Sequence, residues 1–521
     1  MGPLRSILGI SLLLWAGLPA RASDYFLIVG GGPSAANNQV SLEKNVFYLQ
    51  RILASAGVPR SQQICLFADG ADPGRDLHEK LAPDAIPELH RTLATLSGNT
   101  RYLDFRFRNH QVQADGPATK KQLIETLRTL RDQLRPEDRL FIYVTAHGGR
   151  GKPANNARLY LWGNETISVR ELAAELDRFD ARTTIVLVMV QCYSGGFANV
   201  VFRGGDPQRE LCVHRRCGFF ATVQTRAAAG CTPEVEEENY REYSSSFWAA
   251  LYGKTRTGRP VPSADYDGDG TVSLSEAHAY VLTHSETIDI PVKTSEALLR
   301  KYSRLGRPSE ELHTLDGSLE ALLELAGPAD RYVLQTLAEE FSLDAAAPVA
   351  SARKLLDKLQ SERQAKLQRA ARLRQRSGFQ RRRLWNKLTA RWPELVNPWR
   401  PDMPALLAAQ REAILEFVRS QSHYTTLKGT LAEIERLETE ARQAECRWAK
   451  VRRFLRVAEN VVLAQNLPAV AEQQIVQTYE RLCELEAQPF LAFPTVNAAA
   501  AADSAETGHS LTSGRTEGPA R

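Results

Sequence analysis

The chain has 521 residues, of which 43% are hydrophobic and 24% charged, and its formal net charge at pH 7 is +5. This length leaves room for two or more domains with sizeable cores. After the N-terminus no segment approaches ~20 consecutive apolar residues, which excludes a predicted transmembrane span. The positive charge is local, because residues 353–391 hold 14 Lys and Arg but only 2 Asp and Glu.

The N-terminus has the pattern of a secretory signal peptide. A positive charge in Met1–Arg5 precedes the apolar run Ile7–Leu18, and Ala20-Arg21-Ala22 provides a small-x-small cleavage site. We therefore expect residues 1–22 to be removed and the protein to be secreted or periplasmic.

Residues 23–292 predict an α/β domain with a wound, mostly parallel sheet and flanking helices. Apolar runs without polar alternation are typical of strands buried on both faces of such a sheet. Strand and helix patterns alternate along the region, as βαβ units require. The predicted elements are strand Tyr25–Gly30, helix Ser41–Ala56, strand Gln62–Phe67, helix Thr119–Leu134, helix Glu171–Phe179 and strand Gly218–Gln224.

Two further apolar runs each end at a reactive residue, His147 after LFIYVTA and Cys192 after TTIVLVMVQ. If these strands are neighbours in a parallel sheet, both side chains leave it at the edge where ligands bind. An imidazole can take the proton of a thiol and later protonate a leaving amine. We predict that Cys192 is a nucleophile and His147 its general base and acid. The backbone N–H groups of Cys192 and Gly148 are the predicted oxyanion hole.

These residues resemble the caspase-like cysteine peptidases, which include caspases, legumains and related bacterial enzymes. In that group one strand ends in His-Gly and, about 50 residues later, another ends in Gln/Glu-x-Cys or a similar sequence. This chain has Ala146-His147-Gly148-Gly149 and Gln191-Cys192. The caspase signature places a small residue between Gln and Cys, which is missing here, so the local fit is closest to divergent bacterial, legumain-like (C13-type) members. The resemblance extends over roughly residues 24–292. It implies a caspase-like fold and hydrolysis of peptide bonds through a Cys–His dyad and an acyl-enzyme intermediate.

The loop after the first strand departs from this family pattern. Caspases and legumains use an arginine there to bind an acidic or amide P1 side chain, whereas residues 30–38 read GGGPSAANN. Specificity for Asp or Asn is therefore not carried over. The same loop lacks the G-x-G-x-x-G spacing of a dinucleotide site, so we expect no nucleotide cofactor. By resemblance, Ser244–Ser246 border the specificity pocket; the alternative is a helix N-cap run.

Residues 265–276, DYDGDGTVSLSE, match the calcium loop of an EF-hand position by position. We predict one structural Ca²⁺ site, because Pro260 and Pro262 leave no helix entering the loop and a paired sensor is not expected. The alternative is an acidic turn that caps the helix Ser273–His284. The predicted calcium ligands are Asp265, Asp267, Asp269, the carbonyl of Thr271, and Glu276.

The chain has seven cysteines, and an oxidising compartment favours pairing with one left over as a nucleophile. Cys212, Cys217 and Cys231 follow Cys192 closely, so we predict a local disulfide, most simply between Cys212 and Cys217. The alternative is a zinc site made of Cys212, His214 and Cys217. We expect Cys65 in the core, and Cys446 and Cys483 on helices that could be bridged.

The remaining chain is predicted to be mainly α-helical. We expect a helical, basic extension at 293–392, a Pro-rich break at 393–404, a helical hairpin-like region at 405–490 and a disordered tail at 491–521. Apolar residues spaced as in a coiled coil predict helix-on-helix packing; these are Leu427, Leu431, Ile434, Leu437 and Ala441.

The basic segment 353–391 and its tryptophans suggest a partner. An anionic membrane surface or an acidic protein fits the charge, whereas export argues against nucleic acid. The alternative is a solvated helix face with Trp385, Trp392 and Trp399 packed among the helices.

Taken together, the sequence predicts an exported, caspase-like cysteine endopeptidase acting on a protein or peptide substrate. One alternative is a non-catalytic, calcium-stabilised binding or scaffold protein. Another is a transpeptidase or ligase, in which an amine instead of water resolves the same acyl-enzyme. The acidic stretch Pro233–Glu242 is a predicted processing site.

Overall fold

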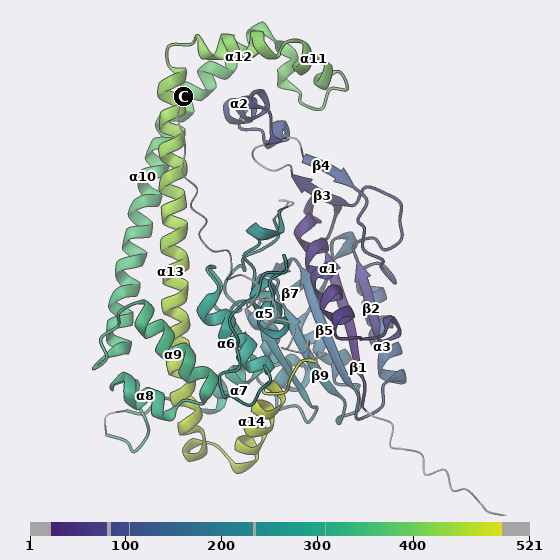
Figure 1. Ribbon diagram of the computed structural model, residues 1–521, viewed down its shortest axis with the longest axis vertical. Helices are drawn as coiled ribbons and strands as arrows, with labels where there is room; N and C mark the ends of the chain where they lie inside the picture. The colour runs from purple at the N-terminus through teal and green to yellow at the C-terminus, as the bar shows by residue number, and fades with distance from the viewer. Residues whose placement is uncertain (1–21, 81–84, 104, 233–235, 308, 492–521) are drawn as a thin grey trace, which may run out of the picture.

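The computed structural model of the protein describes residues 22–80, 85–103, 105–232, 236–307 and 309–491 (Figure 1). The predicted signal peptide, except Ala22, the predicted tail beyond residue 491 and the start of the predicted processing site lie outside these ranges. Within them, no helix is both long and apolar enough to cross a membrane.

A six-stranded, mostly parallel sheet forms the centre of the α/β domain, as predicted, in the order β11-β10-β9-β5-β1-β2. Five strands are parallel and β11 is antiparallel to β10. The strands are β1 (Asp24–Gly31), β2 (Gln63–Phe67), β5 (Arg139–Ala146), β9 (Thr184–Met189), β10 (Arg216–Phe220) and β11 (Val292–Lys293).

The predicted strand Gly218–Gln224 has the wrong bounds at both ends, since β10 begins at Arg216. β10 ends at Phe220 and not at Gln224. The backbone beyond it turns, and Thr222 O accepts a hydrogen bond from Gly195 N at 2.7 Å instead of continuing the ladder.

Alternate residues of the strands face two hydrophobic cores, which explains why the strands lack polar alternation. Phe26 and Ile28 of β1 belong to one core, and Leu27 and Val29 to the other. Helices of the first core are α1 (Val40–Ser55), α5 (Tyr243–Tyr252), α6 (Leu274–His284), α7 (Thr294–Tyr302) and α14 (Gln473–Glu486). Helices of the second are α3 (Lys120–Gln133) and α4 (Val169–Leu176).

Two small antiparallel sheets extend from the domain. The first joins β3 (Leu77–Lys80) to β4 (Phe105–Arg108), and α2 (Glu88–Ser97) lies between them in the chain. The second follows β5 directly. Its strands are β6 (Gly148–Gly149), β7 (Arg158–Leu161) and β8 (Glu165–Ser168).

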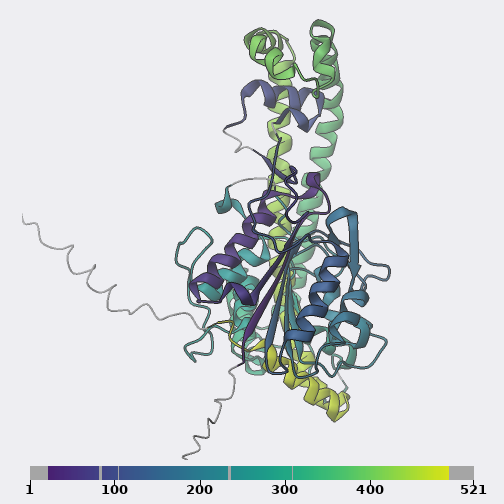
Figure 2. The ribbon, with the colours of Figure 1, turned by 90° about the vertical axis from the view of Figure 1, so that its right-hand side faces the viewer.

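The C-terminal part is mainly helical, as predicted, and two long helices run side by side in it (Figures 1 and 2). They are α10 (Pro348–Arg391) and α13 (Tyr424–Val470). The Pro-rich segment 393–404 lies between them in the chain, at the end of the helix pair that is farther from the central sheet (Figure 1). The remaining helices are α8 (Leu319–Leu325), α9 (Pro328–Glu340), α11 (Met403–Ala409) and α12 (Arg411–Arg419). Leu427, Ile434, Leu437 and Ala441 are buried, which confirms the predicted helix-on-helix packing.

Part of the basic charge of α10 is neutralised within this helix pair. Four of its cations form ion pairs with glutamates of α13: Arg363 with Glu445, Lys366 with Glu440, Arg369 with Glu433 and Arg374 with Glu438. Trp392 is buried, whereas Trp399 is 64% exposed.

The end of the described chain returns to the sheet of the α/β domain. Phe490 packs against Phe26, Phe141 and Trp248, with ring centroids 5.1 to 5.9 Å apart. Glu486 of α14 is buried and accepts hydrogen bonds from the backbone N–H and hydroxyl of Ser295 at 2.8 and 2.7 Å. The core of the sheet therefore includes residues from both ends of the described chain.

Candidate active site

His147 and Cys192 follow neighbouring strands at the same edge of the sheet. β5 pairs with β9 in parallel, with Val144 opposite Met189, and the two reactive residues come three residues later on each strand. Gly148 lies directly against Cys192, because a Cβ atom at Gly148 would be 2.0 Å from the carbonyl oxygen of Cys192. The structure therefore brings together the two segments that the sequence singled out.

The ring of His147 is oriented by the loop after β1. Its Nε2 lies 2.8 Å from the carbonyl oxygen of Asn37 and 2.8 Å from Oε1 of Gln39. A backbone carbonyl only accepts, so Nε2 carries the proton and donates it, which leaves the lone pair on Nδ1. Burial lowers the pKa of His147, opposed by the bond to Asn37. The imidazole is therefore neutral at pH 7, as a general base requires.

The thiol of Cys192 is held by a second loop. Its Sγ accepts a hydrogen bond from Ala228 N at 3.3 Å and lies 3.9 Å from Ala228 O. Burial raises the pKa of Cys192; the Ala228 backbone opposes this and the negative charge of Asp289 adds to it. The raised pKa of Cys192 and the lowered pKa of His147 leave a neutral thiol and a neutral imidazole at pH 7. Among the described residues no hydrogen bond joins the two side chains.

Asp289 is a buried carboxyl group that sequence reasoning missed. Its Oδ1 accepts a hydrogen bond from Ala229 N at 2.7 Å, one residue beyond the contact with Cys192. Its Oδ2 is buried without a hydrogen-bond partner. Burial raises the pKa of Asp289 to about 7, and the backbone of Ala229 and the charge of Arg453 oppose this shift. The group therefore changes charge near neutral pH beside the candidate nucleophile.

Arg453 of α13 fixes the loop that carries Asp289. The fully buried guanidinium donates to the carbonyl oxygens of Asp289, Ser285 and Thr287 at 2.9, 2.7 and 3.1 Å. An arginine in a helical pattern is typical of a solvated face, so the sequence held no signal for this contact. The C-terminal helices thus act directly on a loop of the candidate site.

All seven cysteines are free thiols in the structure. The predicted disulfide between Cys212 and Cys217 is therefore wrong: Cys217 is fully buried in β10, whereas Cys212 lies 2.9 Å from Nδ1 of His214. Cys65 is buried in the core, as expected. Cys231 Sγ lies 3.9 Å from the carbonyl oxygen of Ala146, the residue before His147.

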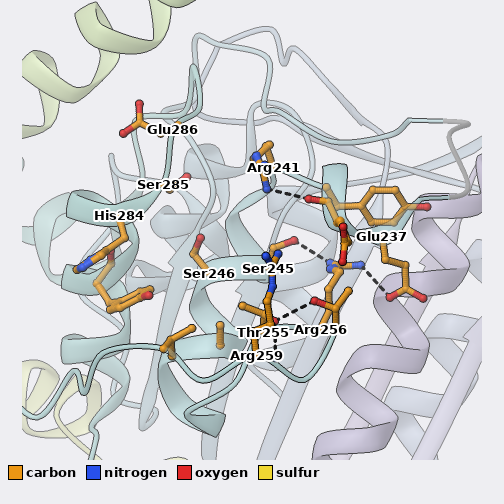
Figure 3. A pocket seen from close by; sticks show the side chains of 16 residues that line it. Glu237, Arg241, Ser245, Ser246, Thr255, Arg256, Arg259, His284, Ser285 and Glu286 are labelled. Atoms are coloured by element: carbon orange, nitrogen blue, oxygen red, sulfur yellow. Dashed lines mark hydrogen bonds and ion pairs between the residues drawn. The ribbon is translucent and has the colours of Figure 1, made fainter. Parts of the chain in front are cut away.

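A cavity of about 310 Å³ lies beside the first turn of α5 (Figure 3). Ser245 and Ser246 line it, but neither His147 nor Cys192 does. Arg256, also in its lining, donates to Glu242 Oε1 and Ser245 Oγ at 2.8 Å each. Ser245 and Ser246 therefore border a charged cavity whose lining does not include the thiol of Cys192.

The predicted calcium loop gathers three of its five ligands. Oxygen atoms of Asp265, Asp267 and Asp269 lie within 4.8 Å of one another. Glu276 instead turns its carboxylate to backbone N–H groups, among them Tyr266 N at 2.6 Å and Ser273 N at 2.8 Å, and it caps α6. As predicted, no helix enters the loop, since residues 253–273 are non-helical. Hard carboxylate oxygens at this spacing fit Ca²⁺.

The sheet and the positions of His147, Gly148 and Cys192 indicate a class of protein. A mostly parallel α/β sheet that places His-Gly and Cys at the ends of two neighbouring strands is the arrangement expected of caspase-like peptidases. Residues 110–206 match the family model described as the Peptidase C13 family, and this segment contains His147, Gly148 and Cys192. The match confirms the predicted resemblance to the caspase and legumain-like family.

No curated protein matches the chain. Among solved structures, a crystal structure of a Geobacter sulfurreducens protein, a structural genomics target, is similar to 50% of this chain and to 88% of its own chain. The identity is 10% and the TM-score is 0.28.

Proposed function

We propose that the protein is an exported cysteine endopeptidase that uses Cys192 and His147. The observation that carries the proposal is the parallel pairing of β5 with β9, which sets both residues at one edge with Gly148 against the carbonyl of Cys192. The match to the Peptidase C13 family over the same segment supports peptide-bond hydrolysis.

The proposed reaction begins when Nδ1 of His147 takes the proton of the Cys192 thiol as its sulfur attacks the substrate carbonyl carbon. The oxyanion that forms accepts hydrogen bonds from the backbone N–H groups of Cys192 and Gly148. His147 then gives its proton to the leaving amine, and the C–N bond breaks to leave a thioester. Water, deprotonated by His147, hydrolyses the thioester and restores the thiol.

Because the Cys192 thiol and the His147 imidazole are both neutral before substrate binds, the proposed mechanism is general-base catalysis and not attack by a preformed thiolate. The raised pKa of Cys192 and the lowered pKa of His147 both oppose an ion pair before substrate binds. Proton transfer is therefore coupled to attack on the carbonyl.

The test uses the full chain under reducing conditions with calcium present. A peptide library is incubated with the wild type, with Cys192→Ala, with His147→Ala and with Cys446→Ala as the matched control on α13. We expect cleavage by the wild type and by Cys446→Ala only. Cleavage that persists in Cys192→Ala would overturn the assignment. Adding an excess of an amine-bearing acceptor peptide separates hydrolysis from ligation, because a ligase yields the joined product by mass spectrometry.

We also propose that residues 265–276 hold one structural Ca²⁺. Leu274 N donates to Gln488 O at 3.0 Å, so an ordered loop supports the segment that leads to Phe490. Calcium would draw Asp265, Asp267 and Asp269 together and neutralise their charge. A rise in melting temperature with calcium, absent in Asp267→Asn, tests this proposal.

Two further proposals concern location and partner. Export predicts that N-terminal sequencing of protein from the periplasm or medium begins after residue 22. The cations of 353–391 that have no glutamate partner in α13 are proposed to contact an anionic surface or an acidic protein. Salt-sensitive binding of the full chain to anionic vesicles, but not to neutral ones, supports the surface.

A further inference from the structure

A second group of potential metal ligands lies away from the candidate active site. Asp177, Cys212 and His214 place one donor atom each within 4.8 Å of the others. Cys212 Sγ is 2.9 Å from Nδ1 of His214 and 3.6 Å from Oδ1 of Asp177. These residues come from two separate parts of the chain, so the fold itself creates the cluster.

The cluster sits at the opposite edge of the sheet from Cys192. Asp177 caps the end of α4 before β9 begins at Thr184, and His214 comes just before β10 begins at Arg216. β9 and β10 are parallel, so the segments that lead into them, with Asp177 and His214, both lie at the N-terminal ends of the strands. His147 and Cys192 follow C-terminal ends, so the two sites are separate.

The imidazole of His214 is already oriented as a ligand. Its Nε2 lies 3.1 Å from the carbonyl oxygen of Phe179, which only accepts, so Nε2 holds the proton and Nδ1 presents its lone pair toward Cys212. Histidines that bind zinc commonly donate their other N–H to a carbonyl in this way.

Asp177 is likewise held in place by groups outside the cluster. Its Oδ2 accepts from Gly204 N at 2.7 Å, and its Oδ1 accepts from Arg216 at 2.6 Å. Carboxylates that bind metals usually carry such supporting hydrogen bonds. As the C-terminal cap of α4, Asp177 also stands at the helix end that favours a cation.

A small cavity of about 10 Å³ adjoins the cluster, and Cys212, His214 and Arg216 line it. A space of this size is about what one water molecule needs. Asp177 does not line it, so the cavity offers room for a solvent ligand on the side of the thiol and the imidazole.

We propose that Asp177, Cys212 and His214 bind Zn²⁺. A thiolate and an imidazole favour zinc over calcium or magnesium, and three protein ligands with a solvent ligand complete a tetrahedron. Zn–S and Zn–N bonds of about 2.3 and 2.1 Å separate S from N by about 3.6 Å, so the thiol must move by less than ~1 Å. On binding, the Cys212 thiol loses its proton to solvent. The zinc ties the segment between α4 and β10 together and takes no part in the proposed peptidase reaction.

The test measures metal binding by the full chain, freed of metal with chelator, reduced and kept in excess calcium to occupy residues 265–276. Cobalt replaces zinc as the probe, because a thiolate–cobalt bond gives a charge-transfer band in the near ultraviolet. We expect one equivalent of cobalt with this band in the wild type and in Cys192→Ala. The band is lost in Cys212→Ala and in His214→Ala, and added zinc removes it from the wild type.

A measurement on the wild type alone covers the case in which these variants fail to fold. Zinc should slow alkylation of Cys212 by iodoacetamide, mapped by mass spectrometry, by about 100-fold at 100 times its Kd. Cys446 is the internal reference, and its alkylation should not change.

Three results would overturn the proposal: a cobalt band that survives in folded Cys212→Ala, a band that disappears in Cys192→Ala, or unprotected Cys212 in saturating zinc. None of them depends on peptidase activity, so the zinc site and the proposed function fail or stand separately.

Discussion

Arg453 on α13 donates its Nε hydrogen to the backbone carbonyl of Asp289, 164 residues earlier in the chain, at 2.9 Å. Asp289 in turn accepts from Ala229, whose neighbour Ala228 donates to the thiol of Cys192. Three hydrogen-bonded steps therefore connect the long C-terminal helix to the candidate nucleophile.

Replacing this arginine should destabilise the fold strongly. Arg453→Met leaves several buried carbonyl oxygens without a donor and Asp289 without a neighbouring cation, so we expect the free energy of unfolding to fall by roughly 3–5 kcal/mol. Urea titration followed by circular dichroism measures this. Arg452→Met changes an exposed arginine on the same turn and should differ little from the wild type. Equal stability of both variants would show that the Arg453 contacts contribute nothing.

The charge of Asp289 should control the reactivity of Cys192 as a function of pH. Because the pKa of Asp289 is about 7, its carboxylate is ionised at pH 8 and raises the pKa of the neighbouring thiol. Asp289→Asn removes that charge, and each unit by which the thiol pKa falls raises the thiolate fraction about tenfold. We expect faster alkylation of Cys192 in the variant at pH 8 and convergence with the wild type at pH 6, where Asp289 is mostly protonated.

Mass-spectrometric mapping of iodoacetamide labelling at several pH values gives these rates. Asp180→Asn, at an exposed position before β9, is the matched control. A difference that is as large at pH 6 as at pH 8 would mean that the substitution acts through structure and not through charge.

Gly148 should tolerate no side chain. A Cβ there would overlap the carbonyl of Cys192 at 2.0 Å, so Gly148→Ala must push apart the two segments that carry His147 and Cys192. A misplacement near 1 Å typically costs about 100-fold in rate, and we expect kcat/KM to fall by at least that factor. In Gly149→Ala the nearest atoms to the new Cβ belong to the Tyr160 side chain, at 2.9 to 3.1 Å, and that partly exposed side chain can turn away. Kinetics on one peptide substrate compare the two, and equal activity would contradict the close approach.

Acid should destabilise the protein partly through His278. This residue is fully buried, its Nδ1 lies 2.9 Å from the hydroxyl of Tyr243, and burial lowers its pKa to about 3. In the unfolded chain a histidine takes up a proton near pH 6.5, so the unfolded state binds more protons and stability falls as the pH drops from 6.5 toward 3. At pH 4.5 the loss amounts to roughly 2–3 kcal/mol.

His278→Gln keeps a partner for Tyr243 but does not titrate, so its stability should fall less between pH 6.5 and 4.5. Chemical denaturation at both pH values measures the difference. His423→Gln, at an exposed position, should keep the wild-type slope. If His278→Gln also kept it, the buried imidazole would not be the group responsible.

The local parts of the fold were predictable from the sequence, because buried strands and capped helices leave local patterns. The predicted helix Ser273–His284 is α6 with Ser273 as its N-cap, and the strands ending near His147 and Cys192 are β5 and β9. Long-range contacts leave no such pattern. Nothing near Arg453 or Asp289 in the sequence reveals that these residues are in contact. The number and spacing of the cysteines predicted a disulfide between Cys212 and Cys217, whereas in the folded chain His214 lies beside Cys212.

The contacts of Phe490 and Glu486 with the sheet also set an order of events during synthesis. β1 and β5 leave the ribosome hundreds of residues before the segment that completes their core. The domain that carries Cys192 therefore cannot complete its core until the segment that ends at Phe490 has been synthesised.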